Sequence, residues 1–430
     1  MKKTYTIKEY GSFCAKEGIK GYKPLPEEIF KQLEQFILEN NREGEDGALE
    51  LMGLSARKGV GKIITAKNYV GIITMKDGTT IEILHKIYSE VDSDESGVRT
   101  KKLLIDMLKT LRDTPYKTLQ TSNVNIEKMN IFEIFIRMFI DEMFFIVKRG
   151  LKCSYETIEE NATFFKGKMK FSQQVKCNFA HKERNYVEYD AFNANRPENR
   201  LLKATLQYLY KHSVSSKNRN DIKNLLNSFG EIEASVDYKA DFSKYVPDRN
   251  MKDYTTALMW SKVFLMGKSF TSFAGSEVAV ALLFPMETVF ESYIAALIKK
   301  ELIPKGYSVS VQDKKYHLFD EPEKKFLMKP DIVVTRKTDG VKFIMDTKWK
   351  VLSESKQNYG ISQSDMYQMY AYQKKYSVQS TTKNVTLLYP QTDSVSRNDI
   401  EFSSEDGIIV RVRFVDLFKI KELNFEELFK

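Results

Sequence analysis

The chain has 430 residues, 42% of them hydrophobic, and its 67 Lys and Arg against 58 Asp and Glu give a formal charge of +9. Two or three domains with proper cores are expected, and the modest basic excess permits a nucleic-acid partner without demanding one. Three scattered cysteines without a CxxC disfavour disulfides and structural zinc. No signal sequence or long uncharged apolar run is present, so we expect a soluble, cytoplasmic protein with no membrane partner.

The first 115 residues are expected to form a β-rich N-terminal module. Apolar, β-rich runs at 69–75 and 79–84 flank the dipeptide Asp77-Gly78. Because Asp-Gly between two such runs favours a tight turn, the segment predicts a β-hairpin.

Residues 116–270 are expected to form a mostly helical middle module. An amphipathic helix is predicted at 127–148, and further helices are predicted near 199–213 and 217–229. The intervening stretch 150–195 lacks a clear period, and we expect irregular structure there.

Residues 271–430 alternate helical and strand-like patterns, which predicts a C-terminal α/β domain. The expected elements, in chain order, are a helix at 287–302, a strand at 308–312, a hairpin over 332–347, a helix at 362–376 and strands at 385–389 and 408–414. The whole chain is therefore expected to be a multidomain α+β protein.

The hairpin of this last domain carries the candidate chemistry. Pro330-Asp331 opens its first apolar run, a turn signal follows, and the second run ends in Asp346-Thr347-Lys348. Side chains alternate along a strand, so Asp346 and Lys348 point the same way, and pairing can bring Asp331 beside them. Two carboxylates and an ammonium at one sheet edge could hold Mg²⁺ against a phosphodiester and activate water. The alternative is an ordinary surface hairpin with a salt bridge.

This pattern resembles the PD-(D/E)xK nuclease superfamily, whose restriction-endonuclease-like fold the C-terminal domain would share. The resemblance implies a Mg²⁺-dependent DNA endonuclease with Asp331, Asp346 and Lys348 as catalytic residues. Both aspartates and the backbone carbonyl of Thr347 would bind the metal, and Lys348 would stabilise developing charge or position the water.

Three accessory residues follow from the same resemblance. Many members place a metal-binding glutamate on the helix ahead of the hairpin, where Glu291 is the better candidate and Glu287 its rival. After the hairpin, Gln368 and Tyr372 are four residues apart and share a helix face, which matches the Gln-x-x-x-Tyr element of RecB-like nucleases. An amide and a phenol there could bind phosphate or hold the carboxylates in place, although core packing also explains such spacing.

The order of segments along the chain resembles the McrC family, the nuclease subunits of McrBC-type restriction systems, including the LlaJI-like branch. The segments that carry this resemblance are 68–87, 149–155, 165–169, 189–203, 284–291, 330–331 and 346–348. It implies an antiphage restriction complex in which the chain docks on an AAA+ GTPase ring of McrB type through its first two modules. The chain would stimulate GTP hydrolysis and cut double-stranded, modified DNA.

Two other functions stay open from the sequence. The chain could be a stand-alone RecB-like repair nuclease, which would share the C-terminal chemistry, or a non-catalytic regulatory or DNA-binding subunit. No nucleotide site is expected in this chain, because the glycine-rich segment 57–63 lacks the first Gly and the final Ser or Thr of a phosphate-binding loop.

Overall fold

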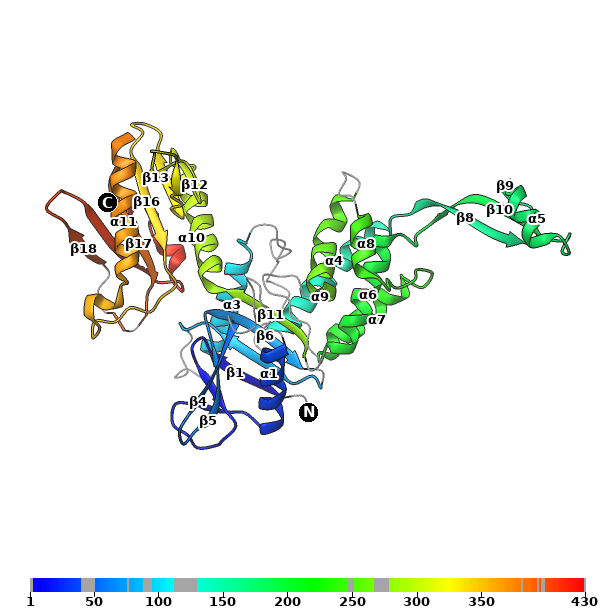
Figure 1. Ribbon diagram of the computed structural model, residues 1–430, viewed down its shortest axis with the longest axis horizontal. Helices are drawn as coiled ribbons and strands as arrows, with labels where there is room; N and C mark the ends of the chain where they lie inside the picture. The colour runs from blue at the N-terminus through cyan, green and yellow to red at the C-terminus, as the bar shows by residue number, and fades with distance from the viewer. Residues whose placement is uncertain are drawn as a thin grey trace. The chain divides into compact units, whose positions relative to one another are not determined.

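A computed structural model describes residues 3–39, 51–75, 77–87, 95–111, 130–245, 251–266, 278–379, 382–392, 394–395 and 399–428. Residues 1–131 and 269–430 form one compact unit, and residues 132–268 form a second (Figure 1). The expected module boundaries near 115 and 270 lie outside the described residues. No helix in the described part of the chain is long and apolar enough to span a bilayer.

The N-terminal part of the first unit contains two four-stranded sheets and a helix. The first sheet has the order β1(Thr4–Lys8), β7(Thr80–Leu84), β6(Tyr69–Met75), β11(Val278–Pro285). The second has the order β3(Lys23–Pro24), β2(Ser12–Cys14), β5(Gly61–Ala66), β4(Met52–Arg57). The hairpin predicted around Asp77 is confirmed as β6 and β7, which pair antiparallel.

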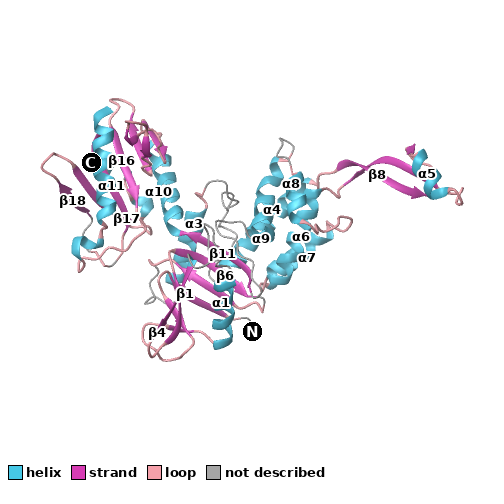
Figure 2. Cartoon of the chain, in the orientation of Figure 1, coloured by secondary structure: helices cyan, strands magenta, loops and turns pink. Residues whose placement is uncertain are grey.

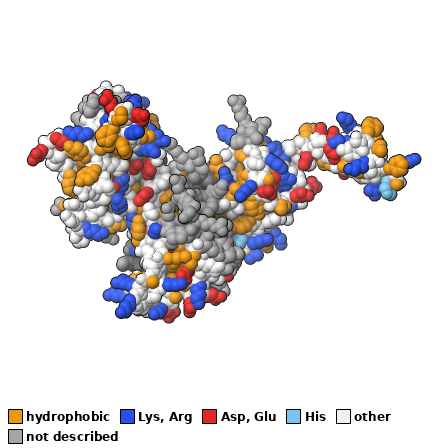
Figure 3. Space-filling view, viewed as in Figure 1, with side chains coloured by type: hydrophobic (Ala, Val, Ile, Leu, Met, Phe, Trp, Pro, Cys, Tyr) orange, Lys and Arg blue, Asp and Glu red, His pale blue; other side chains and the backbone are white. Residues whose placement is uncertain are grey.

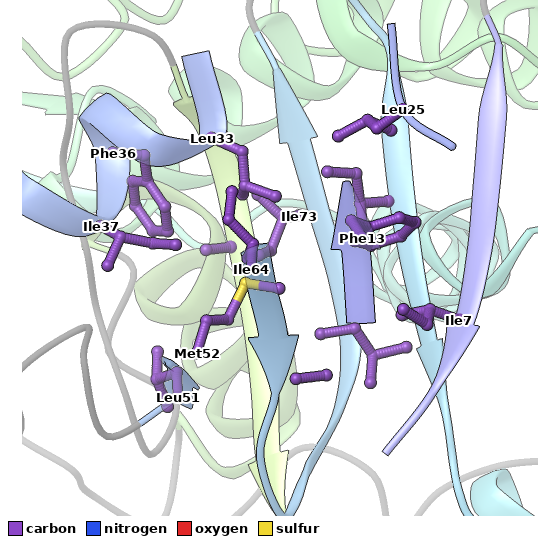
Figure 4. Close-up of a cluster of buried hydrophobic side chains, with 14 of the residues drawn as sticks. Ile7, Phe13, Leu25, Leu33, Phe36, Ile37, Leu51, Met52, Ile64 and Ile73 are labelled. Carbon is purple, nitrogen blue, oxygen red and sulfur yellow. The ribbon is translucent and has the colours of Figure 1, made fainter. Parts of the chain in front are cut away.

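The core of this part lies between the sheets and helix α1(Glu27–Glu39), as Figure 4 shows. Apolar side chains come from both sheets and from the inward face of the helix. The buried residues drawn and named there are Ile7, Phe13, Leu25, Leu33, Phe36, Ile37, Leu51, Met52, Ile64 and Ile73. Helix α3(Glu95–Leu108) follows these strands and packs against α10(Met286–Leu302).

Strand β11 joins the first sheet, although its residues belong to the predicted C-terminal module. It pairs antiparallel with β6, and Leu283 lies opposite Gly71. Gly71 has a φ of +139°, and a Cβ at this position would lie 2.0 Å from the carbonyl oxygen of Leu282. The close approach of the two strands therefore requires glycine here. Because β11 leads directly into α10, the first sheet is covalently continuous with the helix that carries Glu291.

The C-terminal part is built on a six-stranded mixed sheet with helices. Its strand order is β12(Tyr307–Val311), β15(Ile332–Arg336), β16(Lys342–Thr347), β17(Thr382–Pro390), β19(Ile409–Val415), β18(Asp399–Ser403). Helix α11(Gln363–Gln379) connects the parallel strands β16 and β17 and packs on β16, β17 and β19. The remaining elements are the hairpin β13(His317–Phe319) and β14(Lys325–Leu327), and the short helices η4(Gln357–Gly360), η5(Ile420–Glu422) and η6(Phe425–Leu428).

The second unit combines a helical bundle with a long arm (Figures 1 and 2). The bundle contains α6(Pro197–His212), α7(Ser216–Asn227), α8(Tyr238–Lys244), η3(Lys252–Tyr254), α9(Thr255–Met266) and most of α4(Ile131–Arg149). The start of the helix predicted at 127–148 lies outside the described residues, and its remainder is confirmed as α4.

The arm overturns the expectation of irregular structure at 150–195. It consists of β8(Ser154–Ala162), β9(Lys168–Met169), α5(Phe171–Asn178) and β10(Asn185–Asn193), with β8 and β10 paired along nine residues. Most residues of β8 and β10 are partly or fully exposed. Few residues of the ribbon are buried, and β8 carries no apolar alternation that would mark it as a strand.

Candidate active site

The two predicted aspartates lie beside each other at one end of the β15–β16 hairpin. Ile332 pairs with Met345, so Asp331, one residue earlier, comes level with Asp346. The Asp331 Oδ2 atom accepts hydrogen bonds from both the backbone N–H and the hydroxyl of Thr347, each at 2.7 Å. The hairpin therefore brings the predicted carboxylates together and orients one of them.

The predicted lysine and two accessory residues line up beside Asp346. The ammonium Nζ of Lys348 lies 2.5 Å from Asp346 Oδ2 and donates a hydrogen bond of 3.3 Å to Gln368 Oε1. Gln368 Nε2 in turn donates to the Tyr372 hydroxyl at 2.7 Å. Gln368 and Tyr372 therefore share one face of α11, as their spacing predicts, and the glutamine gives the ammonium a second partner besides Asp346.

Glu291, on α10, is tied to the hairpin through a residue that the sequence analysis missed. Gln312 donates its side-chain N–H to Glu291 Oε1 at 3.1 Å and its backbone N–H to the Asp331 carbonyl at 2.8 Å. Its φ of +50° is unusual for a residue other than glycine and directs the chain out of β12 at this point. The rival Glu287, one turn earlier, is exposed. Nothing in the local pattern marks Gln312.

The electrostatics of the site favour added positive charge. Burial is the largest influence on the three carboxyl groups, and it raises the pKa of Asp331, of Asp346 and of Glu291, the last to about 7. Repulsion from Asp331 raises the pKa of Asp346 and Glu291 further. Burial lowers the pKa of Lys348, but attraction to Asp346, Asp331 and Asp365 together more than offsets this, and the net pKa is raised. One lysine therefore does not neutralise the site.

Asp365, in the first turn of α11, is a further acidic residue near the lysine. It accepts a hydrogen bond of 2.8 Å from Lys350 Nζ, and its other oxygen lies 4.0 Å from Lys348 Nζ. Its backbone N–H donates to Ser362 Oγ at 3.2 Å. An acidic residue in a first helical turn is also favoured by the helix dipole, so the sequence alone does not indicate this contact.

The donor set fits Mg²⁺, which prefers oxygen ligands. Asp346 is 1% exposed. Its Oδ2 atom forms an ion pair with the Lys348 ammonium but accepts no well-aligned hydrogen bond from a described residue. Among the described residues, no three His, Cys, Asp or Glu side chains are grouped so as to hold a metal ion. The candidate ligands are therefore the carboxylates of Asp331 and Asp346, with the Thr347 carbonyl and Glu291 as further candidates.

The fold and this site define a multidomain, mixed α/β protein with an acidic and basic edge on its C-terminal sheet. A family model described as "McrBC 5-methylcytosine restriction system component" matches residues 64–390. The chain belongs to this family, which confirms the resemblance to McrBC-type restriction systems.

Two solved structures that align with this chain come from Thermococcus gammatolerans. One is described as a refined half-complex from a tetradecameric assembly of McrB AAA+ hexamers with bound McrC. A chain of that structure aligns with this protein at a TM-score of 0.68 and 19% sequence identity. The alignment covers 96% of this chain and 94% of that one. A chain of the cryo-EM structure of the McrBC complex aligns with a TM-score of 0.49 and 19% identity, covering 70% and 87%. No curated protein sequence matches.

Proposed function

We propose that this chain is the Mg²⁺-dependent DNA endonuclease subunit of a GTP-driven, modification-dependent restriction complex. The observation that carries the proposal is the convergence of Asp331, Asp346 and Lys348 at the end of one hairpin, in a chain that belongs to the McrBC family. The C-terminal sheet with its flanking helices supports a PD-(D/E)xK nuclease domain, and the complex would act on DNA in the cytoplasm.

The chemistry assigned to each residue follows from its contacts. Asp331, Asp346 and the Thr347 carbonyl would hold Mg²⁺, which supplies Lewis acidity toward phosphate oxygen and lowers the pKa of a bound water. Thr347 keeps the Asp331 carboxylate oriented through two hydrogen bonds. Lys348, positively charged and directed by Gln368, would stabilise charge that develops on the phosphate.

A second part of the proposal is that the chain docks on a McrB-type AAA+ GTPase ring. The relative of similar fold was solved with McrB hexamers, and the arm of this chain offers a suitable contact surface. Figure 3 shows hydrophobic side chains gathered near the outer end of the arm among lysines and arginines. The exposed apolar residues of the arm are Tyr155, Phe164, Phe165, Phe171, Val175, Phe179 and Phe192. Apolar exposure on this scale is typical of a protein interaction surface.

The test is cleavage of modified and unmodified plasmid by the purified chain with Mg²⁺ and GTP, in the presence and absence of a McrB-type partner. Asp346→Asn is the test variant. Asp320→Asn is the matched control, because Asp320 is an exposed aspartate of the same domain that also pairs with a lysine. We expect cleavage of modified DNA that requires the partner, GTP and an intact Asp346.

Other outcomes would point to the alternatives. Cleavage without the partner would favour a stand-alone nuclease. Stimulation of the partner's GTP hydrolysis without any cleavage would favour a non-catalytic subunit. Equal cleavage by the wild type and Asp346→Asn would refute the assigned site.

A further inference from the structure

The side chain that follows the proposed catalytic lysine is anchored by the first sheet of the protein. Trp349 is 1% exposed, and its indole N–H lies 3.0 and 2.9 Å from the two carboxylate oxygens of Glu9. Glu9 directly follows β1, and it is 4% exposed. A buried carboxylate from the N-terminal strand therefore holds a residue 340 positions later in the chain.

Lys86, two residues beyond the end of β7, binds the backbone carbonyl of the same tryptophan. Its own backbone N–H donates to Glu9 Oε1 at 3.1 Å, and its Nζ donates to the Trp349 carbonyl at 2.6 Å. The same ammonium lies 5.0 Å from the centre of the indole ring, within the range of a cation–π contact. Glu9 and Lys86 thus hold both the side chain and the carbonyl of residue 349.

Trp349 also contacts the other side of the site. Its ring lies 5.3 Å from that of Phe290, the residue before Glu291 on α10. On the hairpin side, the backbone N–H of Lys348 donates to the Leu388 carbonyl at 2.9 Å and ends the pairing with β17. Beyond that bond, the backbone N–H of Lys350 donates to the Lys348 carbonyl at 3.1 Å, and the contacts of Trp349 fix the residue between them.

We propose that Glu9 and Lys86 are positioning residues for DNA cleavage, which hold Trp349 and thereby set the place of the Lys348 ammonium. The inference rests on the proposed nuclease function. It assigns to the residues that follow β1 and β7 a role in positioning the cleavage site, in addition to any role in partner docking. A displacement of about 1 Å at a catalytic group can cost on the order of 10²-fold in rate. Loss of the contacts that hold Trp349 is therefore expected to slow cleavage measurably.

The first experiment reads the anchor directly by fluorescence. The chain has two tryptophans, so Trp260→Phe leaves Trp349 as the sole reporter. We expect Glu9→Leu to shift its emission to longer wavelength and to increase quenching by acrylamide, whereas Glu9→Gln, which keeps one acceptor oxygen, stays close to wild type. Glu27→Gln is the matched control, because Glu27 is an exposed glutamate of the same module that pairs with Lys31. Unchanged emission in Glu9→Leu would refute the proposal that Glu9 holds Trp349 in place.

The second experiment measures steady-state cleavage with the complete complex. We expect Glu9→Leu and Lys86→Met to lower kcat by on the order of 10–100-fold with KM changed less than about twofold, because transition-state positioning is lost while DNA binding stays. Glu9→Gln should restore most of the rate, and the exposed-lysine control Lys31→Met should match wild type. Wild-type kcat in a folded Glu9→Leu variant would refute the inference alone, whereas an inactive wild-type complex would refute the proposed function and the inference with it.

Discussion

The buried carboxyl group of Glu9 predicts a measurable dependence of stability on pH. Burial raises its pKa from 4.5 to about 7, although Lys86 and the hydrogen bond from Trp349 oppose the rise. Between these two values the native carboxyl holds a proton that the unfolded chain has lost. The native state therefore binds more protons, and the free energy of unfolding falls as the pH rises through this window.

The size of the effect follows from the two pKa values. From about pH 5.5 to about pH 8, the unfolded carboxyl is almost fully ionised throughout, while the native group ionises only near pH 7. Integration of this difference gives a loss of about 2 kcal/mol attributable to Glu9. The window ends near pH 8 because burial lowers the pKa of Lys86 to about 8, and its deprotonation would act in the opposite direction above that pH.

The assay is urea unfolding followed by Trp349 fluorescence in the Trp260→Phe background, at both pH values. Glu9→Gln cannot ionise, so its free energy of unfolding should fall by about 2 kcal/mol less than that of wild type over this range. Glu27→Gln should retain the full wild-type dependence. An identical pH dependence in Glu9→Gln and wild type would refute the reasoning, since it would mean that Glu9 titrates alike in both states.

Three further predictions concern the site and the strand that supports it. Asp346→Asn should lower the rate of Mg²⁺-dependent cleavage by on the order of 10²–10³-fold or more, measured as initial rates of plasmid nicking, and EDTA should abolish the wild-type activity. Gln368→Ala removes an acceptor from the Lys348 ammonium and should cost about 10-fold in the same assay. Gly71→Ala should lower the free energy of unfolding by roughly 1–3 kcal/mol, seen as a lower Tm, because its Cβ would meet the carbonyl of Leu282. A wild-type value in any of these measurements would contradict the role assigned to the residue that was changed.

The hairpin of the site could be predicted because each of its signals is local. Strand alternation places Asp346 and Lys348 on one side, and the structure puts their charged atoms 2.5 Å apart. The turn at Asp339 and Gly340 forms as its dipeptide indicates, with Gly340 at a φ of +71°. The helical spacing of Gln368 and Tyr372 is likewise a property of one element. What these residues do with DNA stays a prediction.

Elements whose partners lie far away in the chain could not be predicted in this way. Strand β11 is absent from the elements expected for the C-terminal domain, and its sequence does not indicate which sheet it joins. The arm escaped prediction because its ribbon is largely exposed and β8 shows no apolar alternation. Gln312 reaches the site because the backbone turns at the end of β12, and no periodicity in the sequence predicts such a turn.

The contact between Glu9 and Trp349 is the clearest example of a contact that the sequence could not predict, because nothing in the local sequence indicates that the Glu9 carboxylate is buried. Its raised pKa means that ionising it in place costs stability, and an apolar side chain in the same position would avoid that cost. What an apolar side chain cannot do is accept hydrogen bonds from both the Trp349 indole and the Lys86 backbone. Glu9 therefore contributes orientation rather than stability, and the orientation it determines is that of the residue next to Lys348.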